Sequence, residues 1–293
     1  MKFARLGPLG QEIPAIITPA GVVRDIRSIT ADVDGAFLAG DGLAEVARAA
    51  RGDQLPTLAT EGVRYGAPIA RPTKVVCIGL NYSDHAAETN AAIPSEPVVF
   101  MKDPSTVLGP FDEVPIPKDS QKTDWEVELG VVIGKTARYL ASPAAAADVI
   151  GGYVLSHDVS EREFQLERGG TWDKGKSCEG FNPLGPWLVT PDEVGDPQAL
   201  ALSLAVNGIP RQKGTTANQI FSVAHVVWYL SQVMVLRPGD LINTGTPAGV
   251  AMGAPGQPYL RAGDVVELAI ERLGASRQVF VGWQDYTAGR WSR

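Results

Sequence analysis

Residues 124–134 read DWEVELGVVIG, which places acidic residues at alternate positions in front of an apolar run. In a β-strand, side chains alternate between two faces, so Asp124, Glu126 and Glu128 share one face and the apolar residues between them share the other. Like charges on one face repel, and burying them without partners costs free energy. The stretch therefore predicts a strand whose acidic face meets either solvent or a positive group.

The rest of the chain also indicates many strands and few helices. Among 293 residues, 32 glycines and 22 prolines separate short apolar runs with strand character. These runs cover 75–80, 127–134, 153–160, 200–208 and 264–270. Two helices are expected, a short one over 42–50 and a longer one over 215–235, which Pro238 and Gly239 end.

The turn-rich stretch GAPIARPT at 66–73 predicts a boundary near residue 70. We therefore expect a small N-terminal domain over 1–70 and a larger domain over 71–293. The length and the hydrophobic content of 44% suffice for a sizeable core.

Composition excludes several classes of partner. A net charge of -7 argues against nucleic acid or an anionic membrane as the main partner. The start MKFARLGPLG has no apolar core of signal-peptide length, and no apolar run reaches the roughly 18 residues of a membrane span. Cys77 and Cys178 form no CxxC pattern, so reduced cysteines in a cytoplasmic protein are expected.

The Glu-x-Glu pair is a candidate metal site. Hard cations such as Mg²⁺ and Mn²⁺ take oxygen ligands, and Glu126 and Glu128 can offer two carboxylates to one ion. Asp158, at the end of another predicted strand, is the best third ligand. The alternative is a solvated strand face, which the apolar run after Glu128 makes less favourable.

His85 and Glu88 form a candidate general base. They are three residues apart, so they share a face on a helical turn, and a carboxylate-oriented imidazole can activate water. The alternative is a surface histidine near a helix start. Of the other two histidines, His157 adjoins Asp158, and His225 lies on the longer predicted helix, where packing is the expected role.

Two glycine-rich loops could contact an anionic substrate. Residues 172–186 carry Lys174 and Lys176, although a solvated turn would look similar. The stretch NTGTPAGV at 243–250 offers a hydroxyl and backbone amides to an oxyanion or carboxylate, or is a plain turn. The sequence lacks the P-loop, the strand-linked GxGxxG motif and the GxSxG elbow.

Taken in order, these segments closely resemble the fumarylacetoacetate hydrolase family over roughly residues 73 to 293. The matching segments are GLNYSDHAAE (79–88), PVVFMK (97–102), DWEVELGVVIGK (124–135), HDVSEREFQ (157–165), GKSCEGFNPLGP (175–186), VNGIPRQ (206–212) and NTGTPAGVAMG (243–253). The resemblance implies an α+β, β-rich fold, a mixed β-roll with few helices that usually forms a homodimer.

The resemblance also implies roles for individual residues. Glu126, Glu128 and Asp158 hold Mg²⁺ or a similar ion such as Mn²⁺. His85 and Glu88 activate water, and Lys176 touches the substrate.

Four further residues are expected to contact the substrate, namely Gln165, Thr246, Arg162 and Glu179. This chain has Glu179-Gly180 where many relatives have an Asp-Thr pair. Three carboxylates, one Mg²⁺ and Lys176 sum to zero formal charge, and Asp124 is expected to be a bystander.

The family likeness predicts hydrolysis of a 2,4-diketo acid at its C3–C4 bond. The sugar-acid branch is most similar, so the expected reaction cleaves 2,4-diketo-3-deoxy-L-rhamnonate (or the fuconate equivalent) to pyruvate and L-lactate. The alternatives are an oxaloacetate-type decarboxylase, an enzyme like the ureidoglycolate lyases or isomerases, and, least favoured, a binding protein without activity.

Overall fold

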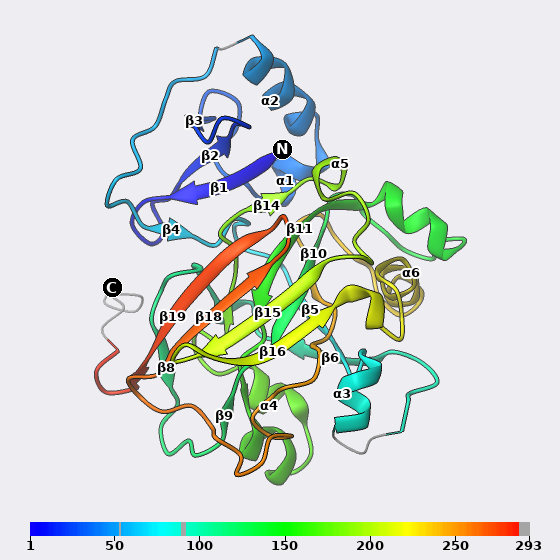
Figure 1. Cartoon of the computed structure of the whole chain (residues 1–293). Coiled ribbons are helices and arrows are strands. Elements are labelled where there is room, and N and C mark those ends of the chain that lie inside the picture. The colour runs from blue at the N-terminus through cyan, green and yellow to red at the C-terminus, as the bar shows by residue number, and fades with distance from the viewer. Residues whose placement is uncertain (53, 89–91, 287–293) are drawn as a thin grey trace.

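The computed structural model of this chain describes residues 1–52, 54–88 and 92–286, and Figure 1 shows short helices that connect many strands. The helices are α1 (Gly35–Ala39), α2 (Gly42–Arg51), α3 (Ser83–Glu88), α4 (Trp172–Lys176), α5 (Pro191–Val194), α6 (Val223–Val233), the 3₁₀ turns η1 (Pro104–Thr106), η2 (Pro143–Asp148) and η4 (Thr216–Asn218), and the π-helical turn η3 (Glu163–Glu167).

Most of the strands are short. They are β1 (Lys2–Leu6), β2 (Ile13–Ile17), β3 (Val23–Asp25), β4 (Tyr65–Gly66), β5 (Val75–Gly79), β6 (Val98–Lys102), β7 (Val107–Leu108), β8 (Val114–Ile116), β9 (Thr123–Asp124), β10 (Val127–Ile133), β11 (Ile150–His157), β12 (Ser160–Glu161), β13 (Asn182–Pro183), β14 (Leu188–Val189), β15 (Ala201–Val206), β16 (Ile209–Thr215), β17 (Leu241–Asn243), β18 (Val265–Ile270) and β19 (Gly274–Gly282). The five apolar runs that the sequence singled out all contain strands, so the β-rich expectation is confirmed.

One sheet of ten strands forms the centre of the molecule. Its order is β3-β2-β1-β14-β11-β10-β17-β5-β6, with β4 paired to β1. Strand β10 lies between β11 and β17, and all seven of its residues are buried. The pairing of β17 with β5 is parallel while β10 and β11 are antiparallel, so the sheet is mixed, as expected.

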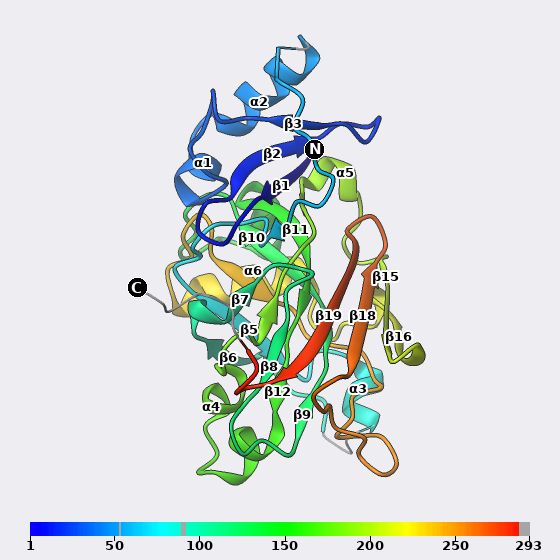
Figure 2. The same ribbon diagram turned by 90° about the vertical axis from the view of Figure 1, so that its left-hand side faces the viewer.

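A second sheet covers one face of the first. Its five strands have the order β16-β15-β18-β19-β8, and β15, β18 and β19 pack against β10 and β11 (Figure 2). Leu129 and Val131 contribute to the core cluster that these strands share. Val132 instead joins the cluster on the opposite face, and Glu128 shares that face because strand side chains alternate.

The N-terminal segment continues the ten-stranded sheet. Strands β1 to β4 pair with one another, and β1 also pairs with β14 (Figure 1). The connection between β4 and β5 contains the expected boundary near residue 70. Whether residues 1–70 form an independent domain stays a prediction.

The acidic stretch is two strands and not one. Asp124 ends β9 and pairs with Ser160 of β12, whereas β10 begins at Val127. Trp125 and Glu126 connect the two strands. The expectation of one continuous strand is therefore wrong, because β9 pairs away from the large sheet.

The long helix was also placed too early in the sequence. Strand β16 extends to Thr215, and α6 begins only at Val223, where Ser222 caps it by accepting a hydrogen bond from the His225 amide. Asn81 holds the segment before the helix, since it accepts hydrogen bonds from the amides of Ile220 and Phe221. This tertiary contact overrides the helical spacing of the apolar residues.

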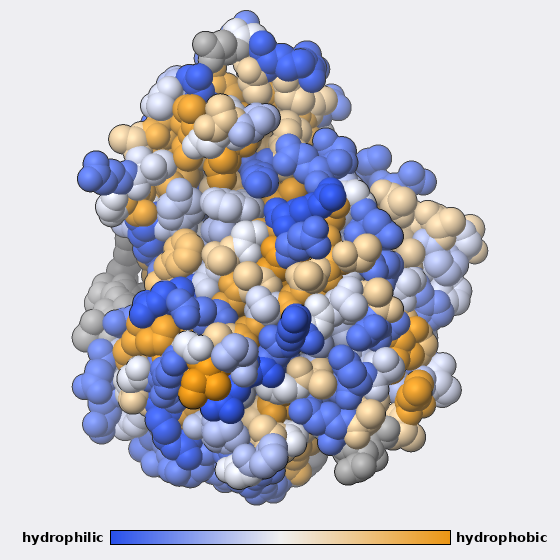
Figure 3. Space-filling model, viewed as in Figure 1, coloured by the Kyte–Doolittle hydropathy of each residue, from blue (hydrophilic) through white to orange (hydrophobic). Residues whose placement is uncertain are grey.

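The surface in Figure 3 mixes hydrophilic and hydrophobic patches. Within the described ranges, no helix is long and apolar enough to cross a membrane. Cys77 and Cys178 are both free thiols, as expected.

Candidate active site

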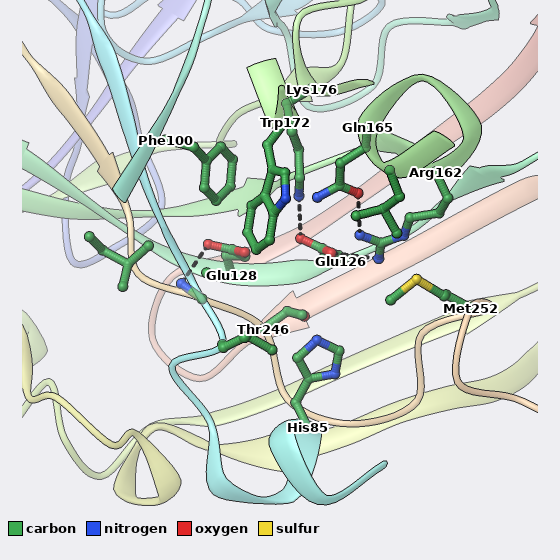
Figure 4. A pocket seen from close by; sticks show the side chains of 15 residues that line it. His85, Phe100, Glu126, Glu128, Arg162, Gln165, Trp172, Lys176, Thr246 and Met252 are labelled. Atoms are coloured by element: carbon green, nitrogen blue, oxygen red, sulfur yellow. Dashed lines mark hydrogen bonds and ion pairs between the residues drawn. The ribbon is translucent and has the colours of Figure 1, made fainter. Parts of the chain in front are cut away.

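Segments that are far apart in the sequence line one cavity of about 190 Å³ (Figure 4). This volume is below the roughly 300–1,000 Å³ of pockets for drug-sized ligands, so the cavity suits a small substrate. The lining residues are Ile78, Gly79, Leu80, His85, Phe100, Glu126, Glu128, Arg162, Gln165, Leu166, Trp172, Lys176, Gly245, Thr246 and Met252.

Three carboxylates form a buried cluster beside this cavity. Glu126, Glu128 and Asp158 each place a carboxylate oxygen within 4.8 Å of those of the other two. Their exposed fractions are 5%, 2% and 0%. Oxygen ligands on opposite sides of a divalent ion are separated by roughly twice the 2.0–2.6 Å metal–oxygen distance, so this cluster has the dimensions of a metal site.

Three cations surround the carboxylates, namely Lys176, Lys102 and Arg162. Lys176 Nζ bridges Glu126 Oε2 and Asp158 Oδ2, at 2.8 Å from each. Lys102, at the end of β6, donates to the other oxygen of Asp158 and to the carbonyl of Val159. Sequence reasoning missed Lys102, although a lysine that closes the apolar strand VVFM was a usable signal.

The charges of these groups depend on one another. Burial raises the pKa of the Glu126 carboxyl, but the attraction of Lys176 and Arg162 outweighs it, so this pKa lies well below its usual value. Burial raises the pKa of Glu128 well above its usual value, and the negative charges of Asp158 and Glu126 raise it further. A divalent cation would relieve this repulsion, so the donor set fits a metal ion.

The predicted charge balance needs correction. It omitted Lys102 and the buried pair of Arg162 with Asp124. The cluster then holds four carboxylates and three cationic side chains, and a divalent ion leaves one positive charge in excess. An excess positive charge favours an anionic substrate.

His85 and Glu88 lie on α3, and His85 lines the cavity. His85 Nδ1 is 3.4 Å from Glu88 Oε2, a long contact of the kind that tightens when substrate binds. Burial raises the pKa of the Glu88 carboxyl, but hydrogen bonds from His85 and the Gly249 amide lower it below its usual value. Glu88 is therefore ionised at neutral pH and able to orient the imidazole.

The loop that follows β17, residues 244–253, contacts the carboxylates through its backbone. The Gly245 amide donates to Glu128 Oε2 at 2.7 Å, and the Gly249 amide donates to both oxygens of Glu88 at 3.0 Å. The sequence suggested that such amides could bind a substrate oxyanion. These two instead bind side chains of the protein itself.

Asp124 is not a bystander, which corrects another expectation. It is fully buried and accepts a hydrogen bond from Arg162 Nε at 2.8 Å. Arg162 Nη2 also donates to Glu126 Oε1 at 2.6 Å. A carboxylate outside the cavity is thus linked through one arginine to the predicted metal site.

The expected substrate contacts are only partly brought together. Gln165, Thr246 and Arg162 line the cavity, whereas Glu179 is not among the lining residues. The Thr246 hydroxyl donates to the Val127 carbonyl at 2.9 Å and accepts from Gln212 at 2.8 Å, so it also supports the cavity wall. Glu179 and Gly180 follow Lys176, which lines the cavity. Gly180 has a φ of 72°, a backbone conformation that disfavours the threonine of the Asp-Thr pattern.

The other histidines lie apart from the cavity lining. His157 is fully buried, and its Nδ1 is 3.0 Å from Gln278 Oε1. His225 stacks on Phe221 with ring centroids 5.2 Å apart. Its place is consistent with the packing role that the sequence suggested.

A buried carboxylate triad and a His–Glu pair at one small cavity are the kinds of group that metal-assisted hydrolysis uses. The C-terminal domain of fumarylacetoacetate (FAA) hydrolase matches residues 74–281. The chain therefore belongs to the fumarylacetoacetate hydrolase family, as its motifs indicated.

Several relatives extend this assignment over the whole chain. The chain is 50% identical to a 2,4-didehydro-3-deoxy-L-rhamnonate hydrolase from Sphingomonas sp. (strain SKA58), with 97% of each chain covered. The structure resembles a fumarylacetoacetate hydrolase from Exiguobacterium antarcticum with a TM-score of 0.83 and 34% identity, covering 96% of this chain and 99% of that one.

A third relative was solved with a metal. Maleylpyruvate hydrolase from Sphingobium sp. SYK-6, in complex with manganese (II) ion and pyruvate, matches with a TM-score of 0.79 and 26% identity. The match covers 96% of this chain and 99% of that one. Neighbours of this fold thus bind a divalent metal, and the present chain holds a buried carboxylate triad.

Proposed function

We propose that this chain is a metal-dependent hydrolase that cleaves the C3–C4 bond of 2,4-diketo-3-deoxy-L-rhamnonate to give pyruvate and L-lactate. The observation that carries the proposal is one small cavity that has the buried carboxylate triad beside it and is lined by the histidine of the His–Glu pair. The Sphingomonas relative, named for this substrate and half identical in sequence, supports the sugar acid over other diketo acids.

The substrate requires an anion site and an electrophilic carbonyl. Its 2-oxo acid end is negatively charged, which suits the excess positive charge of the cluster. A divalent ion held by Glu126, Glu128 and Asp158, which we take to be Mg²⁺ or Mn²⁺, would supply Lewis-acid stabilisation of negative charge on the substrate oxygens. Lys176, already bound to two of these carboxylates, presents its ammonium group to the same end of the cavity.

His85 is the proposed general base. A proton on Nδ1, directed at Glu88, makes Nε2 the basic nitrogen of the ring. Nε2 takes a proton from water, and the hydroxide adds to C4. The C3–C4 bond then breaks, its electron pair forms the enolate of pyruvate, and a proton delivered to C3 completes pyruvate. The hydroxide oxygen stays with C4, which becomes the carboxylate carbon of lactate, so one water is consumed.

Lys176 and the apolar wall support this step. The ammonium group of Lys176 places positive charge where the enolate develops, and burial strengthens that interaction. Phe100 and Trp172 pack edge to face on one side of the cavity with ring centroids 5.3 Å apart (Figure 4). Their rings restrict water near the carboxylates.

The tail of the substrate carries one hydroxyl and one methyl group. Gln165 and Arg162 can hydrogen-bond the hydroxyl, and Leu166 and Met252 offer apolar contact to the methyl. Since Glu179 does not line the cavity, it has no part in the proposal. A cavity that hydrogen-bonds the hydroxyl discriminates against an analogue without it, because buried polar groups would be left unpaired.

The test compares kcat/KM for the diketo sugar acid, acetylpyruvate and oxaloacetate, with products identified by chromatography. We expect the sugar acid to be the best substrate, chelation to remove activity, and Mg²⁺ or Mn²⁺ to restore it. Faster oxaloacetate decarboxylation would replace the proposal with a decarboxylase. Equal kcat/KM values for acetylpyruvate and the sugar acid would contradict the recognition of the hydroxyl. Full activity after chelation would contradict the metal dependence.

The assembly is a separate proposal. A homodimer is expected from the family likeness alone, and light scattering on the purified protein measures it.

A further inference from the structure

We propose that Asp124 is a positioning residue that fixes the two halves of the cavity relative to each other, the carboxylate triad on one side and the His85–Glu88 pair on the other. The roles of these two groups rest on the proposed function. The contacts of Asp124 do not depend on it.

Both carboxylate oxygens of Asp124 bind the 244–253 loop. Oδ1 accepts from the Ala251 amide at 2.7 Å, and Oδ2 accepts from the Met252 amide at 3.1 Å. The neighbouring Trp125 donates from its indole Nε1 to the Gly249 carbonyl at 3.0 Å. The later half of the loop is therefore held by residues that immediately precede Glu126.

The same loop reaches both functional groups. Its Gly249 amide binds Glu88, and its Gly245 amide binds Glu128. Displacing the loop at Ala251 and Met252 would therefore move the support of the general base and one member of the triad together.

A second connection runs through Arg162. Its Nε donates to Asp124 Oδ2, its Nη2 donates to Glu126 Oε1 at 2.6 Å, and its Nη1 donates to Gln165 Oε1 at 3.1 Å. The guanidinium plane is thus fixed at three points. Asp124 sets the orientation of the arginine, and the arginine sets that of the Glu126 carboxylate.

Only a carboxylate can satisfy this position. Four groups donate to Asp124, namely the amides of Trp125, Ala251 and Met252 and the Arg162 guanidinium. An asparagine side chain has one acceptor oxygen, and its NH₂ group would face two of these donors in either orientation. The site is fully buried, so water cannot compensate.

The test uses Asp124→Asn with Asp112→Asn as the matched control. Asp112 likewise accepts from an arginine and a backbone amide, with Arg64 at 2.6 Å and 2.7 Å and Gly109 at 2.8 Å, but it does not line the cavity. Both variants are expected to lower the melting temperature. Two readouts without substrate then separate positioning from general destabilisation: Mn²⁺ affinity by calorimetry, and hydrogen exchange of the amides in residues 244–253.

We expect Asp124→Asn to weaken Mn²⁺ binding by about 10- to 100-fold, the usual effect of losing an outer partner of a metal ligand. Amide exchange in the 244–253 loop should accelerate as well. Asp112→Asn should change neither quantity. Equal Mn²⁺ affinity and equal loop exchange in the two variants would overturn the proposal.

Arg162→Lys tests the second connection at constant charge. An ammonium group cannot replace the fork that binds Asp124, Glu126 and Gln165 at once. If Asp124 acts by position, this variant also weakens Mn²⁺ binding while loop exchange stays as in the parent. If Asp124 acts only through its charge, Arg162→Lys binds Mn²⁺ normally, and the arginine connection is wrong.

These outcomes are independent of the proposed hydrolysis. A parent protein that binds Mn²⁺ but does not cleave the diketo sugar acid would contradict the proposed substrate and leave Asp124 to be decided by affinity and exchange. A parent protein that binds no Mn²⁺ would contradict the metal-dependent function and the proposed effect of Asp124 on the triad. Hydrogen exchange in the 244–253 loop would then decide the proposed effect of Asp124 on the loop that supports Glu88.

Discussion

Two charge clusters among the described residues are built on different plans. Beside the cavity, three carboxylates lie within 4.8 Å of one another. Near the N-terminal strands, a second cluster, here called the junction cluster, consists of Arg5, Glu12, Asp32, Arg64 and Asp112.

The junction cluster alternates in sign. Glu12 lies between Arg5 and Arg64, at 3.2 Å and 3.0 Å. Arg5 also binds both oxygens of Asp32, and Arg64 binds both oxygens of Asp112. Every acid there is paired with an arginine of the same chain. Asp32 also lies 3.2 Å from Arg71, so three arginines face the three acids without a ligand.

The difference shows how structural and functional ion networks can be told apart. An alternating network satisfies its own charges and ties the N-terminal strands to the loop at Asp112. A network that gathers like charges leaves Glu128 with a raised pKa. An added cation would lower this pKa, so that all carboxylates of the network could be ionised together. Stored repulsion of this kind marks a binding site, and it predicts opposite responses to mutation in the two clusters.

The largest expected effect comes from Glu128→Gln. This change removes a triad ligand, so activity should be lost, together with the stabilisation by Mn²⁺, about 2.7 kcal/mol at a ligand concentration 100 times Kd. The metal-free variant should be more stable than the parent, because a buried like charge is gone and glutamine can still accept from the Gly245 amide. Thermal unfolding with chelator and with Mn²⁺ measures both effects.

Glu12→Gln is the paired variant in the junction cluster. It should lower the melting temperature, because the NH₂ group of glutamine would face an arginine. The shift that Mn²⁺ induces should stay as in the parent. The comparison of the two clusters fails if both variants respond to chelator in the same direction.

The next effect is that of His85→Ala. Losing the general base should reduce kcat by about 10²- to 10⁴-fold, while Mn²⁺ affinity stays as in the parent because His85 is not a proposed ligand. Steady-state kinetics and calorimetry on one preparation provide the two values. His225→Ala is the control, and its effect should be confined to stability. Normal hydrolysis by His85→Ala would show that water is activated elsewhere.

Arg5→Met tests the junction cluster directly. It leaves Asp32 and Glu12 short of a buried partner and removes a bond to the Ala67 carbonyl, so the free energy of unfolding should fall by about 3–5 kcal/mol. Urea titration measures this loss. Mn²⁺ affinity should not change, and a change would mean that the two clusters are coupled.

The smallest effect is a pH dependence that originates at His157. Burial lowers the pKa of this imidazole from 6.5 to about 3, so the folded protein keeps it neutral while the unfolded chain binds a proton below 6.5. Stability is therefore present above pH 6.5 and is lost as pH falls toward 3, by roughly 1.4 kcal/mol per pH unit. Unfolding free energies of the parent and His157→Gln should run parallel above pH 6.5 and diverge below it, approaching this slope near pH 5. Parallel curves over the whole range would rule out His157 as the source.

Much of this architecture could be predicted from local patterns. Short apolar runs bounded by glycine and proline located β5, β10, β11, β15 and β18, because such runs are typical of buried strands that end in turns. The ordered motifs also led to Glu126, Glu128 and Asp158, which the fold brings within bonding distance of one ion, and to His85, Glu88 and Lys176 around the same cavity. Their catalytic roles remain predictions.

What the tertiary structure alone decided are the contacts between distant segments. Lys102 meets Asp158 across 56 residues, Arg162 meets Asp124 across 38, and the Gly249 amide meets Glu88 across 161. The sequence determines which residue types are available and on which strand face they lie. The pairing of a charge with its partner depends on where other strands cross that face, so the roles of Lys102 and Asp124, the late start of α6 and the place of Glu179 outside the cavity emerged only when the chain was folded.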